Sequence, residues 1–147
     1  MDRAPTAAVM RDALGGLPVH FVQNDAFAEG LSTSLRIGIR SVPPTCNGAM
    51  ILLGDMPKVS PELIERIIAA FDPAQSCVIC VATAKGERGH PVLWGRQIFG
   101  EMEELRGDAG ARALMIRHAD LVCDVEAGDD TPLADIDTPE ALAAYTR

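Results

Sequence analysis

Apolar side chains recur along the chain in two ways, as short unbroken runs and as stretches spaced at about 3.6 residues, and these predict strands that alternate with helices. The clearest strand, GAMILLGD at residues 48–55, is a continuous apolar run of the kind that is buried on both faces in a parallel sheet. A helix is expected after it, with Ser60 at the N-cap, Pro61 at the first helical position and an apolar stripe that reaches Ile68.

The remaining elements follow from the same two signals. Further strands are expected at residues 17–25, 76–84 and 120–128, and the glycine-broken connection at 85–97 leaves room for a short strand at 91–95. Further helices are expected at residues 6–14, 32–42 (with Ser32 or Thr33 as the N-cap), 96–107, 110–119 and 137–147. Connections of this length suit right-handed crossovers between strands, so we predict an α/β fold with a mainly parallel sheet.

Asp55 ends the predicted strand at residues 48–55, at the side of the sheet where open α/β proteins bind their ligands. Pro57 makes the next turn rigid and holds the carboxylate in one place. A single carboxylate suits Mg²⁺, which keeps several waters and takes further oxygen ligands from substrate phosphates. The alternative is an aspartate that only caps the turn before the next helix.

A second acidic residue and a glycine-rich turn are further candidates. In LADIDTPEAL, capping of the final helix explains Asp137 but not Asp135, which lies on a connection that could return towards Asp55. In GDAGARAL, which begins at Gly107, backbone N–H groups could approach an anion that Arg112 neutralises. A plain turn between two helices fits the same segment.

The histidines give one candidate for substrate contact, His90 in the loop GERGHPVLW. His20 is expected in a strand and His118 at a helix end, so both are expected to be structural. The sequence has no Ser-His-Asp pattern and no G-x-S-x-G turn, which gives no support to a serine hydrolase.

Length and charge narrow the class of protein further. The 147 residues are enough for one domain with a sizeable core. The net charge of −8 argues against a general nucleic-acid binder. No apolar run approaches the roughly 20 residues that span a bilayer, and the N-terminus carries charges where a signal peptide needs its apolar centre. We therefore expect a cytoplasmic protein with no membrane segment.

Four cysteines occur, and Cys77 and Cys80 form a CxxC pair. The pair lies in a predicted strand, where residues three apart point to opposite faces, and no second CxxC or histidine pair accompanies it. We expect buried, reduced cysteines, as is usual in the cytoplasm.

Four segments taken together resemble the molybdenum-cofactor cytidylyltransferases and their guanylyltransferase relatives. These segments are QNDAFAEGLSTSLRIGI, MILLGDMPKVSPELI, GHPVLWGRQIFGEMEELRGDAGARALM and LADIDTPEAL, and they occur in the family's order from about Val19 onwards. The resemblance implies a Rossmann-like, three-layer nucleotidyltransferase fold. It also implies transfer of CMP or GMP from CTP or GTP to a molybdopterin-type acceptor, with release of pyrophosphate.

The resemblance gives roles to named residues. It implies that Asp55 is the principal Mg²⁺ ligand and that Asp135 is a second acidic contact to metal or phosphate. The nucleotide site would be lined by Asn24, Gly30 and Ser34. The residues implied at the acceptor are Gly89, His90, Pro91, Gly107, Asp108 and Arg112.

The family opens with a glycine-rich loop, L-A-A-G-x-S-x-R-x-G-x-x-K, that cradles the triphosphate, and this chain has no counterpart of it. We therefore expect a single domain over residues 1–147 that corresponds to the C-terminal three-quarters of the family fold and is a poor catalyst by itself. In that fold the first strand adjoins residues 48–55, so two copies would cover the open edge as a homodimer. The alternative is that residues 17–22 move in to pair there.

Two other functions remain open. The chain could be a non-catalytic module that binds a nucleotide or a partner. It could also be a related transferase that loads sugar or alcohol phosphates, because the GD-x-P strand end is widely shared.

Overall fold

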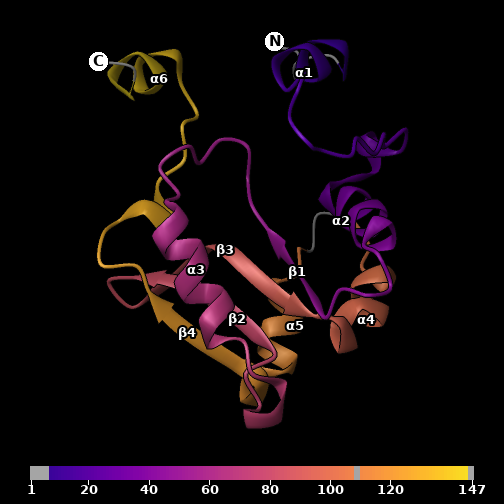
Figure 1. Cartoon of the computed structure of the whole chain (residues 1–147), viewed down its shortest axis with the longest axis vertical. Coiled ribbons are helices and arrows are strands. Elements are labelled where there is room, and N and C mark those ends of the chain that lie inside the picture. The colour runs from indigo at the N-terminus through magenta and orange to yellow at the C-terminus, as the bar shows by residue number, and fades with distance from the viewer. Residues whose placement is uncertain (1–6, 108–109, 146–147) are drawn as a thin grey trace.

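The computed structural model describes residues 7–107 and 110–145, which contain a mixed four-stranded sheet with the strand order β1-β3-β2-β4 (Figure 1). The strands are β1 (Gly48–Ile51), β2 (Ile79–Ala84), β3 (Glu87–Gly95) and β4 (Val122–Glu126). Helices pack on both faces of this sheet. The predicted α/β class is therefore confirmed.

The prediction of a mainly parallel sheet is wrong in its pairings. Among the described strands, only β2 and β4 pair in parallel, while β3 is antiparallel to both β1 and β2. The cause is a two-residue hairpin turn between β2 and β3, in which Lys85 and Gly86 have φ angles of 53° and 80°. The glycine-broken connection predicted at residues 85–97 is instead mostly strand: β3 has nine residues, where only a short strand at 91–95 is expected from the sequence. β3 lies between β1 and β2 and is antiparallel to both, and β4 is parallel to β2, so β1, β2 and β4 run in one direction.

Two apolar clusters lie on opposite faces of the sheet. One packs α2 (Leu31–Ser41), α4 (Phe99–Glu104) and α5 (Arg112–Arg117) against β2 and β3, and Trp94 is its largest fully buried side chain. The other packs α3 (Pro61–Ala70) on the opposite face, through Leu63 and Ile67. Alternate residues of β2 enter the two clusters, as its period of two requires. These layers match the predicted three-layer arrangement.

Several local predictions can be checked against the helix ends. Ser60 is the N-cap of α3, and its Oγ accepts a hydrogen bond from the Leu63 N–H at 3.2 Å, as predicted. The predicted cap of α2 is wrong: the N-cap is Gly30, with φ 109°, while Ser32 and Thr33 lie inside the first turn. α1 (Ala7–Ala13) and α6 (Pro139–Tyr145) lie away from the sheet, at the top of Figure 1. No described helix has the length and apolar character needed to cross a membrane.

Two predicted strands differ from the structure. Residues 19–24 have no regular secondary structure, so the strand expected there, with His20 in it, is not formed. β1 is only half-buried and lies at the end of the described sheet, so the predicted burial on both of its faces is wrong.

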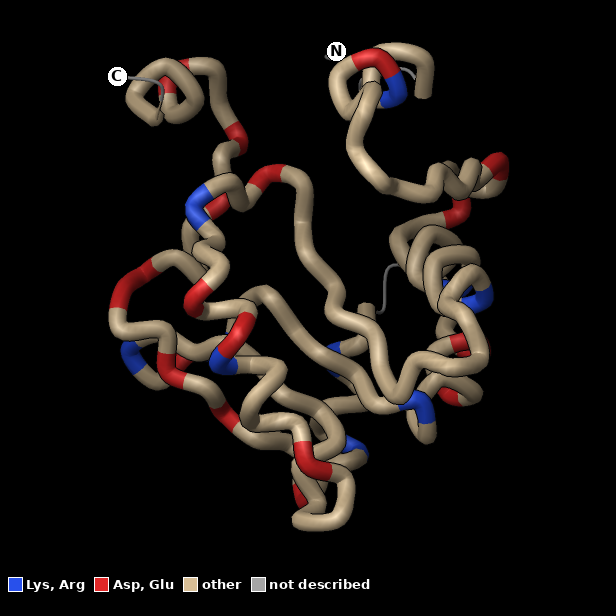
Figure 2. Tube along the Cα trace, in the orientation of Figure 1, with Lys and Arg blue, Asp and Glu red and all other residues tan. Residues whose placement is uncertain are grey.

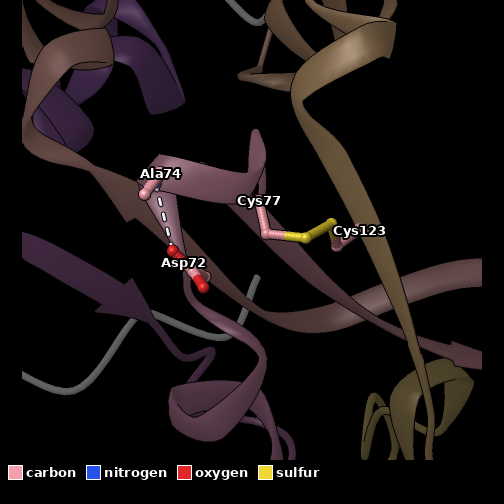
Figure 3. The surroundings of a disulfide bond; sticks show 4 residues. All are labelled: Asp72, Ala74, Cys77 and Cys123. Carbon is pink, nitrogen blue, oxygen red and sulfur yellow. Dashed lines mark hydrogen bonds between the residues drawn. A yellow bond between two sulfur atoms is a disulfide. The ribbon is translucent and has the colours of Figure 1, made fainter.

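The prediction of reduced cysteines is also wrong for one pair. Cys77, just before β2, and Cys123, in β4, form a disulfide with their Cα atoms 5.4 Å apart (Figure 3). Asp72 and Cys77 exchange backbone hydrogen bonds of 3.0 and 2.9 Å, and this turn holds Cys77 beside β4. Cys80, its CxxC neighbour, is a buried free thiol. A disulfide is unusual in a reducing cytoplasm, and the cytoplasmic location stays a prediction.

Reduction of this disulfide should lower the free energy of unfolding. The two cysteines are 46 residues apart, and loop-closure entropy for a loop of that size corresponds to about 4 kcal/mol. Urea denaturation of the parent should therefore shift to lower midpoints in dithiothreitol. The double variant Cys77→Ala/Cys123→Ala should show the same loss with or without reductant, while Cys46→Ala, at a free cysteine, should unfold like the parent. A parent midpoint that does not respond to reductant would contradict the cross-link.

Candidate functional site

The turn after β1 places Asp55 at the carboxyl end of that strand, with its side chain exposed. The buried Met56 anchors the turn, because its side chain is only 7% exposed. The carboxylate is therefore available to a ligand, as predicted, but β1 is the last strand of the described sheet, so the predicted central position is wrong.

A backbone hydrogen bond joins this turn to the segment that carries Asp135. The N–H of Ile136 donates to the C=O of Asp55 at 2.8 Å. Asp135, also exposed, therefore comes close to Asp55 although the two are far apart in sequence. This agrees with the predicted return of the connection, while the bridging of their carboxylates by one ion stays a prediction.

Strand β3 supplies the next part of the site through a bulge. Val81 pairs with Val92 and Thr83 pairs with Arg88, so the segment 89–91 stands opposite the single residue Ala82. A proline such as Pro91 fits at such an interruption of the ladder. The bulge sets His90 near Asp55, whose charge acts on its imidazole, and Gly89 against Pro132.

Gly89 has a packing role that the sequence did not reveal. A Cβ at this position would lie 1.9 Å from the carbonyl oxygen of Pro132, in the short helix η5 (Thr131–Leu133). Only glycine allows this approach. Because the segment to Asp135 continues directly from η5, the contact between Gly89 and Pro132 positions that acidic residue. Contact of Gly89 with the acceptor stays a prediction.

The His90 imidazole is half-buried beside this carboxyl end. Burial lowers the pKa of His90, while the negative charge of Asp55 acts in the opposite direction and is the smaller effect. His90 is therefore expected to be a neutral imidazole at neutral pH, able to donate one hydrogen bond and accept another.

A groove of about 1180 Å³ runs alongside these residues, between α2, β1, β3 and α5. Four predicted site residues line it: Ser34, Gly89, His90 and Arg112. Its lining reaches Leu53 in the turn but includes neither Asp55 nor Asp135. Arg88 and Asp124, which the sequence alone does not indicate, also line the groove and form an ion pair with Nε and Oδ1 2.7 Å apart. Arg88 lies in β3 and Asp124 in β4, and only the pairing of both strands with β2 brings these side chains together.

The predicted nucleotide residues come together at the N-terminus of α2. The Asn24 side-chain amide donates to Thr33 Oγ1 at 2.8 Å and to Ser34 Oγ at 2.9 Å, and its carbonyl oxygen accepts from the Ala26 N–H at 3.0 Å. Gly30 is the N-cap, in a conformation that favours glycine. These residues thus build the helix start, and their contact with a nucleotide stays a prediction.

The glycine-rich turn contributes in a different way from the predicted one. The Gly107 C=O accepts a hydrogen bond from the Ser32 N–H at 3.2 Å, so this turn covers the N-terminus of α2. Asp108 lies outside the described residues. Arg112 begins α5 with its side chain exposed at the groove.

The donor set for a metal ion is small. Within residues 7–107 and 110–145, no group of three or more His, Cys, Asp or Glu side chains could hold an ion. The exposed carboxylates of Asp55 and Asp135 fit only an ion that takes its other ligands from water and phosphate oxygens. Mg²⁺ binds in that way.

Comparison with known proteins identifies the relatives of this fold. The family model for the MobA-like NTP transferase domain matches residues 4–121. This match confirms the family predicted from the sequence. The search of curated proteins gave no match.

Several solved structures have a similar fold. An Rv0371c homologue from Mycobacterium sp. strain JC1 is 29% identical with a TM-score of 0.64, over 76% of this chain and 55% of that one. Rv0371c of Mycobacterium tuberculosis H37Rv, in complex with manganese, is 32% identical with a TM-score of 0.61, over 76% and 57%. A Methanothermobacter nucleotidyl transferase is 24% identical with a TM-score of 0.76, over 95% and 67%, and shows the fold alone. The chain thus spans little more than half of either mycobacterial relative.

Replacement of Gly89 by alanine should destabilise the protein, because the new methyl group meets the Pro132 carbonyl. Overpacking of this kind costs about 1–3 kcal/mol, which thermal and urea unfolding can measure. Gly54→Ala is the matched control beside Asp55, since no described atom lies within 4 Å of a Cβ built there. Equal stability of the two variants would show that the approach of Gly89 to Pro132 is not a constraint.

The pH dependence of stability should carry the signature of His90. Since burial lowers its pKa in the folded state, the unfolded chain binds this proton more readily. The free energy of unfolding should therefore fall as the pH drops below about 6.5, towards the folded pKa. Thermal unfolding of His90→Asn, measured between acidic and neutral pH, should lack this fall in stability. His20→Asn, at an exposed histidine, should keep it. An unchanged slope in His90→Asn would contradict the assignment.

Proposed function

This chain belongs to the MobA-like NTP transferase family, and on that premise we propose that it is a Mg²⁺-dependent nucleotidyltransferase of molybdenum-cofactor maturation. In the proposed reaction, an oxygen of the molybdopterin phosphate attacks the α-phosphorus of CTP or GTP, and pyrophosphate leaves. The observation that carries the proposal is the Ile136–Asp55 backbone hydrogen bond, because it brings the two predicted acidic residues to one end of β1.

The carboxylates of Asp55 and Asp135 are the proposed holders of the divalent ion. Such an ion supplies positive charge to the phosphate oxygens during transfer and aligns the reacting groups. The related Rv0371c, which forms a complex with manganese, supports the use of a divalent metal at the proposed site. Mg²⁺ is proposed because two carboxylates, completed by water and phosphate oxygens, match its preferences.

The large groove is the proposed place for the acceptor. Its apolar walls suit a flat ring system, and the exposed Arg112 offers a positive charge to a phosphate. The neutral imidazole of His90 can orient the acceptor by a hydrogen bond at the end of the groove nearest Asp55.

A second candidate is a module that binds the nucleotide or a partner without catalysis. The hydrogen bonds that occupy Asn24 and Ser34 favour the partner-binding form of this module, because a nucleotide would have to compete with them. A transferase for sugar or alcohol phosphates shares the same strand end and differs only in the acceptor. Binding and turnover measurements separate these three functions.

Titration calorimetry with CTP and GTP, each with and without Mg²⁺, tests the proposed site. Loss of a charged ligand to the metal should weaken Mg²⁺-dependent nucleotide binding by about tenfold or more in Asp55→Asn. Asp137→Asn, which removes the same charge from the segment that carries Asp135, should bind like the parent. Equal affinity of the parent and Asp55→Asn would exclude Asp55 as a ligand.

Turnover is measured in the same samples as pyrophosphate release in the presence of a molybdopterin-type acceptor. We expect slow, Mg²⁺-dependent release that Asp55→Asn abolishes, because this sequence lacks the family's glycine-rich cradle for the triphosphate. Rapid release would show that the described groove is sufficient for catalysis, whereas tight binding without release would favour the non-catalytic module.

A further inference from the structure

The outer edge of β1 has no strand beside it in the described part of the chain, since the sheet order ends there. The N–H of Arg96 donates to the C=O of Asn47 at 2.8 Å, which fixes the alternation of the β1–β3 pair. By that alternation, the backbone N–H and C=O groups of Gly48 and Met50 point away from β3. They form an open row of donors and acceptors.

The two outer edges of the sheet differ in charge. β4 carries Asp124 and Glu126, and charged side chains of this kind discourage pairing with another strand. Residues 48–54 contain no charged side chain. Figure 2 shows the same contrast, with the trace of β1 in tan and red positions along β4. β1 thus presents the unprotected edge.

Apolar hollows lie on both sides of this edge. The large groove extends between α2 and β1, and a smaller groove of about 410 Å³ lies between β1 and α3. Leu52 and Ile68, which line the smaller groove, are 48% and 55% exposed. A strand added to β1 would therefore find apolar surface for the side chains on both of its faces.

A segment with matching character exists in the same chain. Residues 17–22, LPVHFV, are rich in strand-forming side chains but form no described strand. Four large apolar side chains on this segment are 38–57% exposed: Leu17, Val19, Phe21 and Val22. Apolar side chains occur at both odd and even positions, as a strand between two apolar surfaces requires.

We propose that residues 17–22 of one copy pair with the outer edge of β1 in a second copy, and that the reverse exchange closes a twofold dimer. Each copy has one such segment and one such edge, so two equivalent contacts satisfy both. Residues 17–22 of the same copy are less suited to this pairing. Asn24, which follows them, is hydrogen-bonded to Thr33 and Ser34 on α2, and the large groove separates α2 from β1. Exchange between copies leaves these hydrogen bonds intact.

The exchange would also complete the groove described above. The added strand would lie beside β1 and run next to the turn that carries Asp55, so the partner copy would contribute side chains to the wall of the candidate site. The pairing surfaces contain no acidic residue, although each copy carries a net charge of −8. Higher salt should therefore strengthen the dimer, because it screens the repulsion between copies and leaves the apolar contacts in place.

Sedimentation velocity at micromolar concentrations, in low and high salt, tests the exchange. We expect a dimer that tightens with salt, and an approximately tenfold or greater loss of dimer affinity in Val19→Lys and in Leu52→Lys. Phe27→Lys is the matched control, since Phe27 is 73% exposed but belongs to neither surface. Circular dichroism verifies that each variant is folded.

Hydrogen exchange of the parent gives an independent readout. The Met50 amide, which points outwards in one copy, should become protected as the concentration rises through the dimerisation range. A monomer at all concentrations would overturn the proposal, and protection of Met50 in that monomer would assign the edge to the segment of the same copy. A dimer that both lysine variants leave unchanged would also overturn it.

Discussion

Strand β3 is the element on which the other parts of the structure depend, because it is hydrogen-bonded to a strand on each side. Its side chains enter both apolar clusters: Val92 and Trp94 face one, and Leu93 faces the other. The same strand carries the bulge that contains Gly89 and His90. Loss of its register would therefore disturb the sheet, both helix layers and the candidate site at once.

The site itself depends more on backbone geometry than on contacts between its functional side chains. Asp55 and the segment of Asp135 are joined through main-chain atoms, and the approach of Pro132 to Gly89 requires that a side chain be absent. Within residues 7–107 and 110–145, neither carboxylate has a hydrogen bond or ion pair that a ligand would have to displace. The dependence on backbone geometry also means that substitutions distant from the ligand can move the acidic residues.

Local sequence signals predicted those parts of the structure whose causes are local. The Ser60–Pro61 start of α3 is an example, since a cap and a proline act within one turn. The strand β3 is not predicted because a glycine with a positive φ angle, such as Gly86, occurs in loops and in tight hairpin turns alike. Only the pairing of β2 with β3 shows that it is a hairpin turn. The disulfide was missed for the related reason that Cys77 and Cys123 meet only through the β2–β4 register. The exposed position of Asp55 at the end of β1 follows from its place after an apolar run, whereas the requirement for glycine at residue 89 depends on a carbonyl group from a distant segment.

The disulfide lies at the opposite end of the sheet from the candidate site. Cys77 precedes β2 and Cys123 is near the start of β4, while Asp55 follows the carboxyl end of β1, which runs in the same direction. Opening of the disulfide would free the amino ends of two neighbouring strands and leave the ligand-facing end as it is. Proteases act on locally opened chains, so a reducing compartment would shorten the lifetime of the protein without altering what its site can bind. The redox state of its surroundings would then control the amount of the protein and not its chemistry.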